Sequence, residues 1–237
     1  IGLTEVEATG ALLCLDVTEA VLDEAIALGH NLVISHHPLI FKGYKSITGK
    51  DYVERCILKA IKNDIVIYSA HTNLDNAYGG VNYKIAEKIG LKNLQVLEPK
   101  ENSLQDDLMQ AGAGIVGELD EPETELEFLK RIKKTFEVGC VRHNRLTGRE
   151  IQKVALCGGA GAFLLPQAIR AGADVFITGE IKYHDYFGHE GDILMAEIGH
   201  YESEQYTKEI FYSIIRDLFP NFALQSSKIN TNPIKYL

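Results

Sequence analysis

The chain has 237 residues, with 24 basic and 33 acidic side chains and a formal charge of −9. Apolar residues make up 46% and charged residues 24%, the balance of a globular protein that buries a sizeable core. No apolar run approaches the ~18 residues of a membrane span, and the acidic surplus disfavours nucleic-acid binding through lysine and arginine. The four cysteines form no Cys-x-x-Cys pair and the sequence shows no signal peptide, so we expect a cytoplasmic protein with reduced thiols.

Apolar and amphipathic segments alternate along the first part of the chain, which predicts a lobe of the α/β class. Thr18 is a suitable N-cap for the first helix, and Gly29 supplies the left-handed residue that ends it. Asp51 and Glu54 form a potential capping box for the next helix. The expected strands are residues 11–17, 32–35 and 65–70, and the expected helices are residues 18–28, 52–63 and 81–89.

The same alternation returns in the second half, where Thr124 and Glu127 form another potential capping box. Between the halves, residues 98–118 show no clear period. The expected strands here are residues 153–157, 174–178 and 193–198, and the expected helices are residues 124–135, 163–171 and 204–218. We therefore place a first lobe at residues 1–98, a linker or the site of a missing insertion domain at 99–118, and a second lobe at 119–237.

The strand–helix–strand segments of the two halves superpose without a gap at an offset of 143 residues. At this offset Cys14 falls on Cys157, and Gly29 falls on Gly172. The nearly continuous apolar strands are typical of parallel sheets covered by helices on both faces. We therefore expect an α/β fold of two pseudo-symmetric lobes with mainly parallel or mixed sheets.

Three of the predicted strands run directly into imidazole and carboxylate side chains. Ligands of an open parallel sheet gather beyond the carboxyl ends of its strands, so this placement predicts a functional site. His71 and Asp75 lie four residues apart, as do His200 and Glu204. One helical turn would bring the imidazole and the acid of each His-x₃-acid pair to the same face. The candidate residues are His36, His37, His71, Asp75, His200 and Glu204.

Imidazoles combined with carboxylates suit two divalent ions of the Zn, Fe, Mn or Co kind. A lone histidine is more often a solvated or hydrogen-bonded residue, but three such strand ends make coincidence less credible than a shared site. His184 and His189 lie in a tyrosine-rich stretch close to Glu180 and could line a cavity at this predicted site.

Two other motifs leave their function open. The turn Gly158–Phe163 follows a strand but lacks the third glycine of G-x-G-x-x-G, which favours a tight-packing or general anion-binding turn over a dedicated nucleotide fingerprint. The lysine-rich segment 42–50 is either a solvated loop or an approach path for an anionic substrate.

Four blocks of the sequence, in order along the whole chain, resemble the signature blocks of the NIF-three-like family. They are residues 34–41 around the His-His pair, 69–75, 174–180 and 199–204. Many members of this family carry the name GTP cyclohydrolase 1 type 2 homologue. The resemblance implies a duplicated α/β fold, a dinuclear metal centre and a homohexameric toroid. It also implies the metal ligands His36, His37, Asp75, His200 and Glu204, with His71 as a sixth.

From these residues we expect a metal-dependent hydrolase in which two ions activate a water molecule. The substrate would be a nucleotide or related small molecule, and Glu180 would act as an acid, a base or a substrate-orienting group. The alternative is a ring-shaped metal-binding scaffold or interaction protein without turnover.

Overall fold

The computed structural model describes residues 1–3, 5–100, 111–189 and 191–237. The chain forms two compact units, each with its own sheet. Unit 1 comprises residues 1–72 and 207–234, and unit 2 comprises residues 73–206 and 235–237. Unit 1 thus takes its last helix and strand from the C-terminal part of the chain. The predicted α/β class with parallel and mixed sheets is confirmed.

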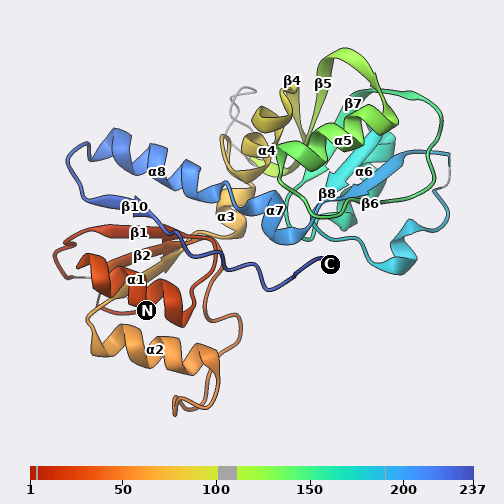
Figure 1. Ribbon diagram of the computed structural model, residues 1–237. Coiled ribbons are helices and arrows are strands. Elements are labelled where there is room, and N and C mark those ends of the chain that lie inside the picture. Colours follow the sequence, from red (N-terminus) through yellow and green to blue (C-terminus); the bar gives the residue numbers. More distant parts are fainter. Residues whose placement is uncertain (4, 101–110, 190) are drawn as a thin grey trace. The chain divides into compact units, whose positions relative to one another are not determined.

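The sheet of unit 1 is parallel throughout, with strand order β10-β1-β2-β3. Figure 1 shows helices α1 and α2 on one side of this sheet and α8 on the other. The strands are β1 (Ala11–Cys14), β2 (Leu32–Ser35), β3 (Val66–Ser69) and β10 (Leu224–Ser226). The helices are α1 (Glu19–Leu28), α2 (Tyr52–Lys62) and α8 (Thr207–Leu218).

The helix ends of unit 1 show why these segments fold as expected. The Thr18 hydroxyl accepts the N–H of Val21 at 3.3 Å, and Gly29 ends α1 with a φ of 69°. The capping box expected at α2 forms only in part: Asp51 accepts the Glu54 N–H at 2.8 Å. The Glu54 carboxylate turns instead to the preceding loop, where it accepts the N–H groups of Thr48 and Lys50.

The sheet of unit 2 is mixed, with strand order β4-β5-β7-β8-β9-β6. Strands β7, β8 and β9 run parallel, whereas β4, β5 and β6 pair with their neighbours in antiparallel fashion. The strands are β4 (Lys92–Pro99), β5 (Gly112–Thr124), β6 (Arg142–His143), β7 (Glu150–Cys157), β8 (Val175–Thr178) and β9 (Leu194–Glu197).

Helices cover this second sheet on both faces (Figure 1). Phe176 and Met195 pack against the helix that follows β7. Phe128 and Ile132 belong to the buried apolar face of the helix that follows β5. The capping box predicted at Thr124 and Glu127 is confirmed. The helices are α4 (Val81–Ile89), α5 (Glu125–Thr135) and α6 (Leu165–Arg170), and the short 3-10 turns are η1 (Ala162–Leu164) and η2 (Tyr183–Tyr186).

Part of the predicted linker is strand. Residues 112–118, which show no apolar period, form the first half of β5, while residues 101–110 lie outside the described part of the chain. The small residues serve close packing: a Cβ on Gly112 would lie 2.3 Å from the carbonyl oxygen of Glu98. A strand built from glycine and alanine has no apolar alternation to reveal it.

The strand registers agree with the offset of 143 residues. Cys14 pairs with Ser35 between β1 and β2, and Cys157 pairs with Thr178 between β7 and β8. In each unit a third parallel strand, β3 or β9, then continues the sheet. A short helical turn follows each of these third strands: α3 (Thr72–Asp75), where the chain passes from unit 1 to unit 2, and α7 (His200–Glu204).

Candidate metal-binding residues

Unit 1 gathers three imidazoles at the carboxyl ends of β2 and β3. His36 and His37 directly follow β2, and His71 lies two residues after β3. The ring centroids of His36 and His37 are 4.9 Å apart, and that of His71 lies 5.4 Å and 5.7 Å from them. One ring nitrogen from each lies within 4.8 Å of the others, so the three residues are placed to hold a metal ion.

Hydrogen-bond acceptors fix the orientation of two of these rings. Nδ1 of His36 lies 2.9 Å from the carbonyl oxygen of Ala70, and Nδ1 of His37 lies 2.7 Å from a carboxylate oxygen of Asp16. The second Asp16 oxygen accepts the hydroxyl of Thr231. Because a carbonyl or carboxylate oxygen can only accept, Nδ1 carries the proton and the lone pair that could bind a metal ion lies on Nε2.

Unit 2 gathers an imidazole and two carboxylates. His200 and Glu204 lie four residues apart on α7, with His200 Nε2 3.1 Å from Glu204 Oε2. A carboxylate oxygen of Asp75, the last residue of α3, lies within 4.8 Å of one of Glu204. The expected helical turn between the residues of each His-x₃-acid pair is present at α7, whereas His71 immediately precedes α3.

Glu180 is bound to His200. Its carboxylate Oε1 lies 2.7 Å from His200 Nδ1, so Glu180 and Glu204 contact opposite nitrogens of the same ring. The hydrogen bond to Glu204 raises the pKa of His200, burial opposes this shift, and the contact with Glu180 adds to it. In this arrangement Glu180 orients the imidazole, as a carboxylate does beside many metal-binding histidines.

The glycine-rich turn after β7 packs against this acidic set. A Cβ on Gly159 would lie 2.3 Å from Glu204 Oε1, and a Cβ on Gly179, which directly follows β8, would lie 2.8 Å from Ser203 Oγ. Gly159 also has a φ of +60°, so only glycine fits here without strain. The turn thus brings its backbone directly beside the side chains of α7.

Side chains already occupy the N–H groups that an anion would need at this turn. Gly158 N–H donates to Asn82 Oδ1 at 2.9 Å, Gly159 N–H to Ser203 Oγ at 3.0 Å, and Gly161 N–H to Thr178 Oγ1 at 3.0 Å. Of the two interpretations of the turn, the contacts favour tight packing over anion binding.

Asp16 is the residue that the sequence analysis missed. It follows β1 with one residue between, so it meets the same strand-end criterion that identified His36 and His37. Its carboxylate is 21 positions from His37 in sequence, and only the pairing of β1 with β2 brings the two strand ends together.

The fold and these donors define an α/β protein with side chains that could hold a metal ion at the carboxyl ends of parallel strands. Neutral imidazole Nε2 atoms and carboxylate oxygens are the ligands that first-row divalent ions accept. Within the described residues, no helix is long and apolar enough to cross a membrane.

The chain belongs to the Duf34/NIF3 (NGG1p interacting factor 3) family, whose model matches residues 1–233. This confirms the resemblance that the sequence motifs indicated. A Lactococcus lactis protein named GTP cyclohydrolase 1 type 2 homolog is 33% identical, covering 98% of this chain and 88% of the relative. A Clostridium perfringens protein of the same name is 37% identical, covering 86% of this chain and 76% of the relative.

Solved structures agree with this assignment. A hypothetical protein from Staphylococcus aureus superposes with a TM-score of 0.90 at 33% identity, covering 100% of this chain and 90% of that one. A Bacillus cereus protein related to NIF3 superposes with a TM-score of 0.89 at 26% identity, covering 100% of this chain and 92% of that one.

Some relatives are longer. The alignment with a Staphylococcus aureus GTP cyclohydrolase 1 type 2 homolog runs over 340 positions at 28% identity and covers all of this chain. That relative therefore contains residues without a counterpart in the 237 residues of this sequence.

Proposed function

We propose that this chain is a metal-dependent hydrolase that uses two divalent ions held by three histidines of unit 1 and three residues of unit 2. When bound, two such ions supply a water molecule of lowered pKa, and hence hydroxide at neutral pH. The proposed ligands are His36, His37, His71, Asp75, His200 and Glu204.

The observation that carries the proposal is the orientation of three imidazoles. Nδ1 of His36, His37 and His200 lies against an acceptor oxygen in each case, at 2.9, 2.7 and 2.7 Å. In His36 and His37 this contact holds the tautomer with the lone pair on Nε2, as a metal-binding histidine requires, and Nε2 of His200 faces Glu204, the next proposed ligand.

The covalent chain supports one shared set of ligands. His71 ends the imidazole set of unit 1 and Asp75 begins the acidic set of unit 2, with three residues between them. Four residue steps span at most about 14 Å even when fully extended. We propose that Glu180 acts in this ligand set by orienting the imidazole of His200.

We also propose that the enzyme works as a homohexamer in the cytoplasm.

The substrate class in this proposal is a nucleotide or related small molecule, which the relatives' name GTP cyclohydrolase 1 type 2 homolog suggests. The exposed lysine-rich loop after the His-His pair adds positive charge suited to an anionic substrate.

The test is the metal content per chain, measured by elemental analysis, together with turnover of a nucleotide panel. We expect about two ions per chain in the unaltered protein, and loss of both metal and turnover in Asp75→Ala. Asp217→Ala, which removes an exposed acid from α8, is the matched control and keeps both. Fewer than two ions after reconstitution contradicts the dinuclear set, and full metal content without turnover favours the scaffold function.

A further inference from the structure

A second concave site lies in unit 2, formed by β6, the loop that follows it and the η2 turn. The cavity has a volume of about 540 Å³, within the range of small-molecule pockets. None of its lining residues is a proposed metal ligand. Its walls are formed by Arg142, His143, Arg145, Tyr183, Tyr186 and Phe187.

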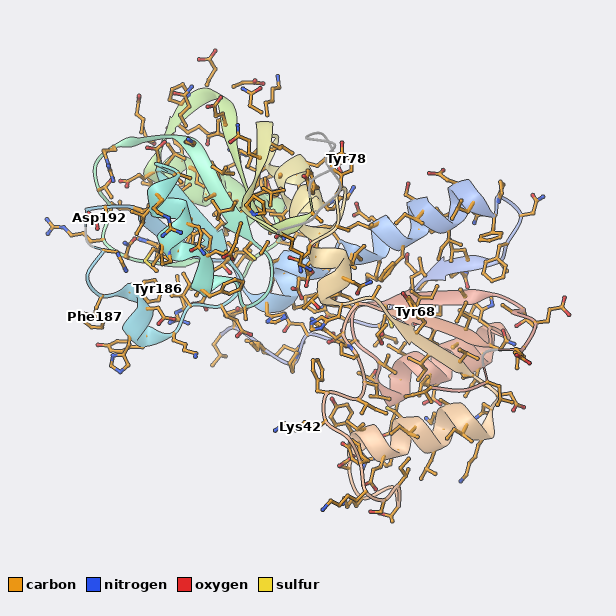
Figure 2. All side chains as sticks on the ribbon, turned by 180° about the vertical axis from the view of Figure 1, so that it is seen from behind. Lys42, Tyr68, Tyr78, Tyr186, Phe187 and Asp192 are labelled. Carbon is orange, nitrogen blue, oxygen red and sulfur yellow. The ribbon has the colours of Figure 1, made fainter. Side chains whose placement is uncertain are left out.

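The aromatic side of the cavity carries two largely exposed rings. Tyr183 is 69% exposed and Phe187 is 56% exposed, although their ring centroids lie only 5.3 Å apart. Figure 2 shows Tyr186, the last residue of η2, close to Phe187, which follows it. Exposed aromatic rings grouped around a hollow offer the stacking surface that a planar ring uses.

The other side of the cavity is basic. Arg142 is paired with Glu197 at 2.8 Å and lies 5.8 Å from the centre of the Tyr186 ring. Arg145 is exposed, and no ion pair or hydrogen bond of its side chain occurs within the described residues. The lining contains no aspartate or glutamate. A guanidinium without an internal partner can bind the two oxygens of a phosphate or carboxylate group.

The backbone that carries these groups is held firmly. The Asn144 side chain donates to the carbonyl oxygen of Ile193 at 2.9 Å and accepts the N–H of Met195 at 2.9 Å, which ties the loop after β6 to β9. Glu197, the last residue of β9, also accepts the N–H of Ile181 and the hydroxyl of Tyr186. The cavity thus adjoins the carboxyl end of a parallel strand, where α/β proteins bind their ligands.

We propose that this cavity binds a planar aromatic molecule that carries a phosphate or carboxylate group. The ring stacks on Tyr183 and Phe187, and the anionic group pairs with Arg145. The inference goes beyond the proposed hydrolase, because it needs neither metal nor turnover.

Calorimetric titration with four probes tests this inference. Phenyl phosphate and benzoate each combine a ring with an anion, inorganic phosphate is an anion without a ring, and benzyl alcohol is a ring without an anion. We expect one of the first two to bind at least about tenfold more tightly than inorganic phosphate or benzyl alcohol. Whichever of phenyl phosphate and benzoate binds more tightly shows whether the cavity prefers a phosphate or a carboxylate group. A ring-bearing anion that binds no more tightly than inorganic phosphate overturns the inference.

Paired variants locate the binding. Arg145→Gln is expected to weaken binding of the ring-bearing anion by about fivefold or more, whereas Arg170→Gln, at an exposed arginine of α6, leaves it unchanged. Tyr183→Leu weakens binding, whereas Phe163→Leu, at another exposed ring, does not. Equal affinities for Arg145→Gln and Arg170→Gln overturn the inference.

Two further measurements distinguish binding in this cavity from binding at the metal ligands and from self-association of the chain. Asp75→Ala is expected to lose metal but to bind phenyl phosphate as the unaltered protein does, so a failure of the hydrolase proposal leaves this inference intact. Binding that disappears in Asp75→Ala but survives in Arg145→Gln shows that the metal ligands held the probe, and overturns it. Sedimentation that changes in Arg145→Gln without any probe binding also overturns it, and identifies a contact between copies of the chain.

Discussion

Nδ1 of His200 lies 2.7 Å from a carboxylate oxygen of Glu180, and the same contact joins His37 to Asp16 in the other unit, also at 2.7 Å. The two pairs come from different strands of each sheet. In unit 1 the acid follows β1 and the imidazole follows β2, whereas in unit 2 the acid follows β8 and the imidazole follows β9. When β1, β2 and β3 are matched with β7, β8 and β9, the orienting contact of unit 2 therefore lies one strand later than that of unit 1.

Removing the orienting acid should weaken metal binding without removing a ligand. We expect Glu180→Gln and Asp16→Asn each to lower metal affinity by about 10- to 100-fold, because the imidazole loses the acceptor that fixes its tautomer and direction. Competition with a chromophoric chelator measures the affinity. Glu150→Gln, at an exposed glutamate of β7, serves as the control. An affinity for Glu180→Gln equal to that of the control contradicts an orienting role.

The glycine beside Glu204 should matter for metal binding as well as for stability. Gly159 and Gly172 have φ values of +60° and +69°, so alanine at either position adds about 1–2 kcal/mol of backbone strain. Only at Gly159 would the new Cβ also meet the Glu204 carboxylate; nothing lies within 4 Å of the Cβ at Gly172.

We therefore expect Gly159→Ala and Gly172→Ala both to lower the free energy of unfolding, measured by urea denaturation. Only Gly159→Ala should also lose metal. Equal metal content in the two variants would show that the turn does not position Glu204.

The regular parts of the fold could be predicted from the sequence because they carry strong local signals. Gly29 ends α1 and Gly90 ends α4, each with positive φ, and the Thr124 capping box begins α5. Strand β10 has only three residues, and the first half of β5 is largely glycine and alanine. Neither offers an apolar period long enough to detect.

The ligand candidates could be predicted because each directly follows an apolar strand or lies one turn beyond it. Their orienting partners could not be predicted in the same way. Asp16 and His37 meet only through the parallel pairing of β1 with β2. Ser203 fixes the glycine turn through a contact that joins residues 44 positions apart. Such contacts depend on the tertiary fold, and no local pattern in the sequence encodes them.

Among the four thiols, one should react rapidly in the folded protein. Cys14, Cys56 and Cys157 are buried, and Cys140 is exposed. Burial, with a smaller effect of Glu19, raises the pKa of Cys56 to about 11, so little reactive thiolate forms at neutral pH. We expect one fast thiol per chain in a native titration with an aromatic disulfide reagent, and four in guanidinium chloride. Cys140→Ser should remove the fast reaction; a fast reaction that persists contradicts the burial of the other three.

Two buried carboxylates should make the stability depend on pH in the acid range. Glu54 Oε2 accepts the N–H and hydroxyl of Thr48 and the N–H of Lys50, at 2.8, 2.9 and 3.1 Å. Glu125 holds another Thr-Gly loop in the same way, accepting the N–H and hydroxyl of Thr147 and the N–H of Gly148. Burial alone would raise the pKa of both groups, but these hydrogen bonds lower both, that of Glu54 to about 2.

The direction of the pH effect follows from these lowered values. The unfolded chain takes up protons at these groups near pH 4.5, whereas folded Glu54 does so only near 2. The contribution of Glu54 to stability is therefore complete above about pH 4.5 and is lost as the pH falls toward 2, and the contribution of Glu125, whose pKa is also lowered, is lost in the same direction. We expect Glu54→Gln and Glu125→Gln to lose more unfolding free energy at pH 7 than at pH 3, measured by urea denaturation.

The loss at pH 7 should be larger for Glu125→Gln, because Glu125 accepts through both oxygens and glutamine has only one. Glu54 accepts all three of these hydrogen bonds through one oxygen, which a glutamine carbonyl can partly replace. Glu150→Gln, at an exposed carboxylate, should show no such pH dependence. If Glu54→Gln destabilises the protein equally at both pH values, its buried carboxylate does not contribute through its charge.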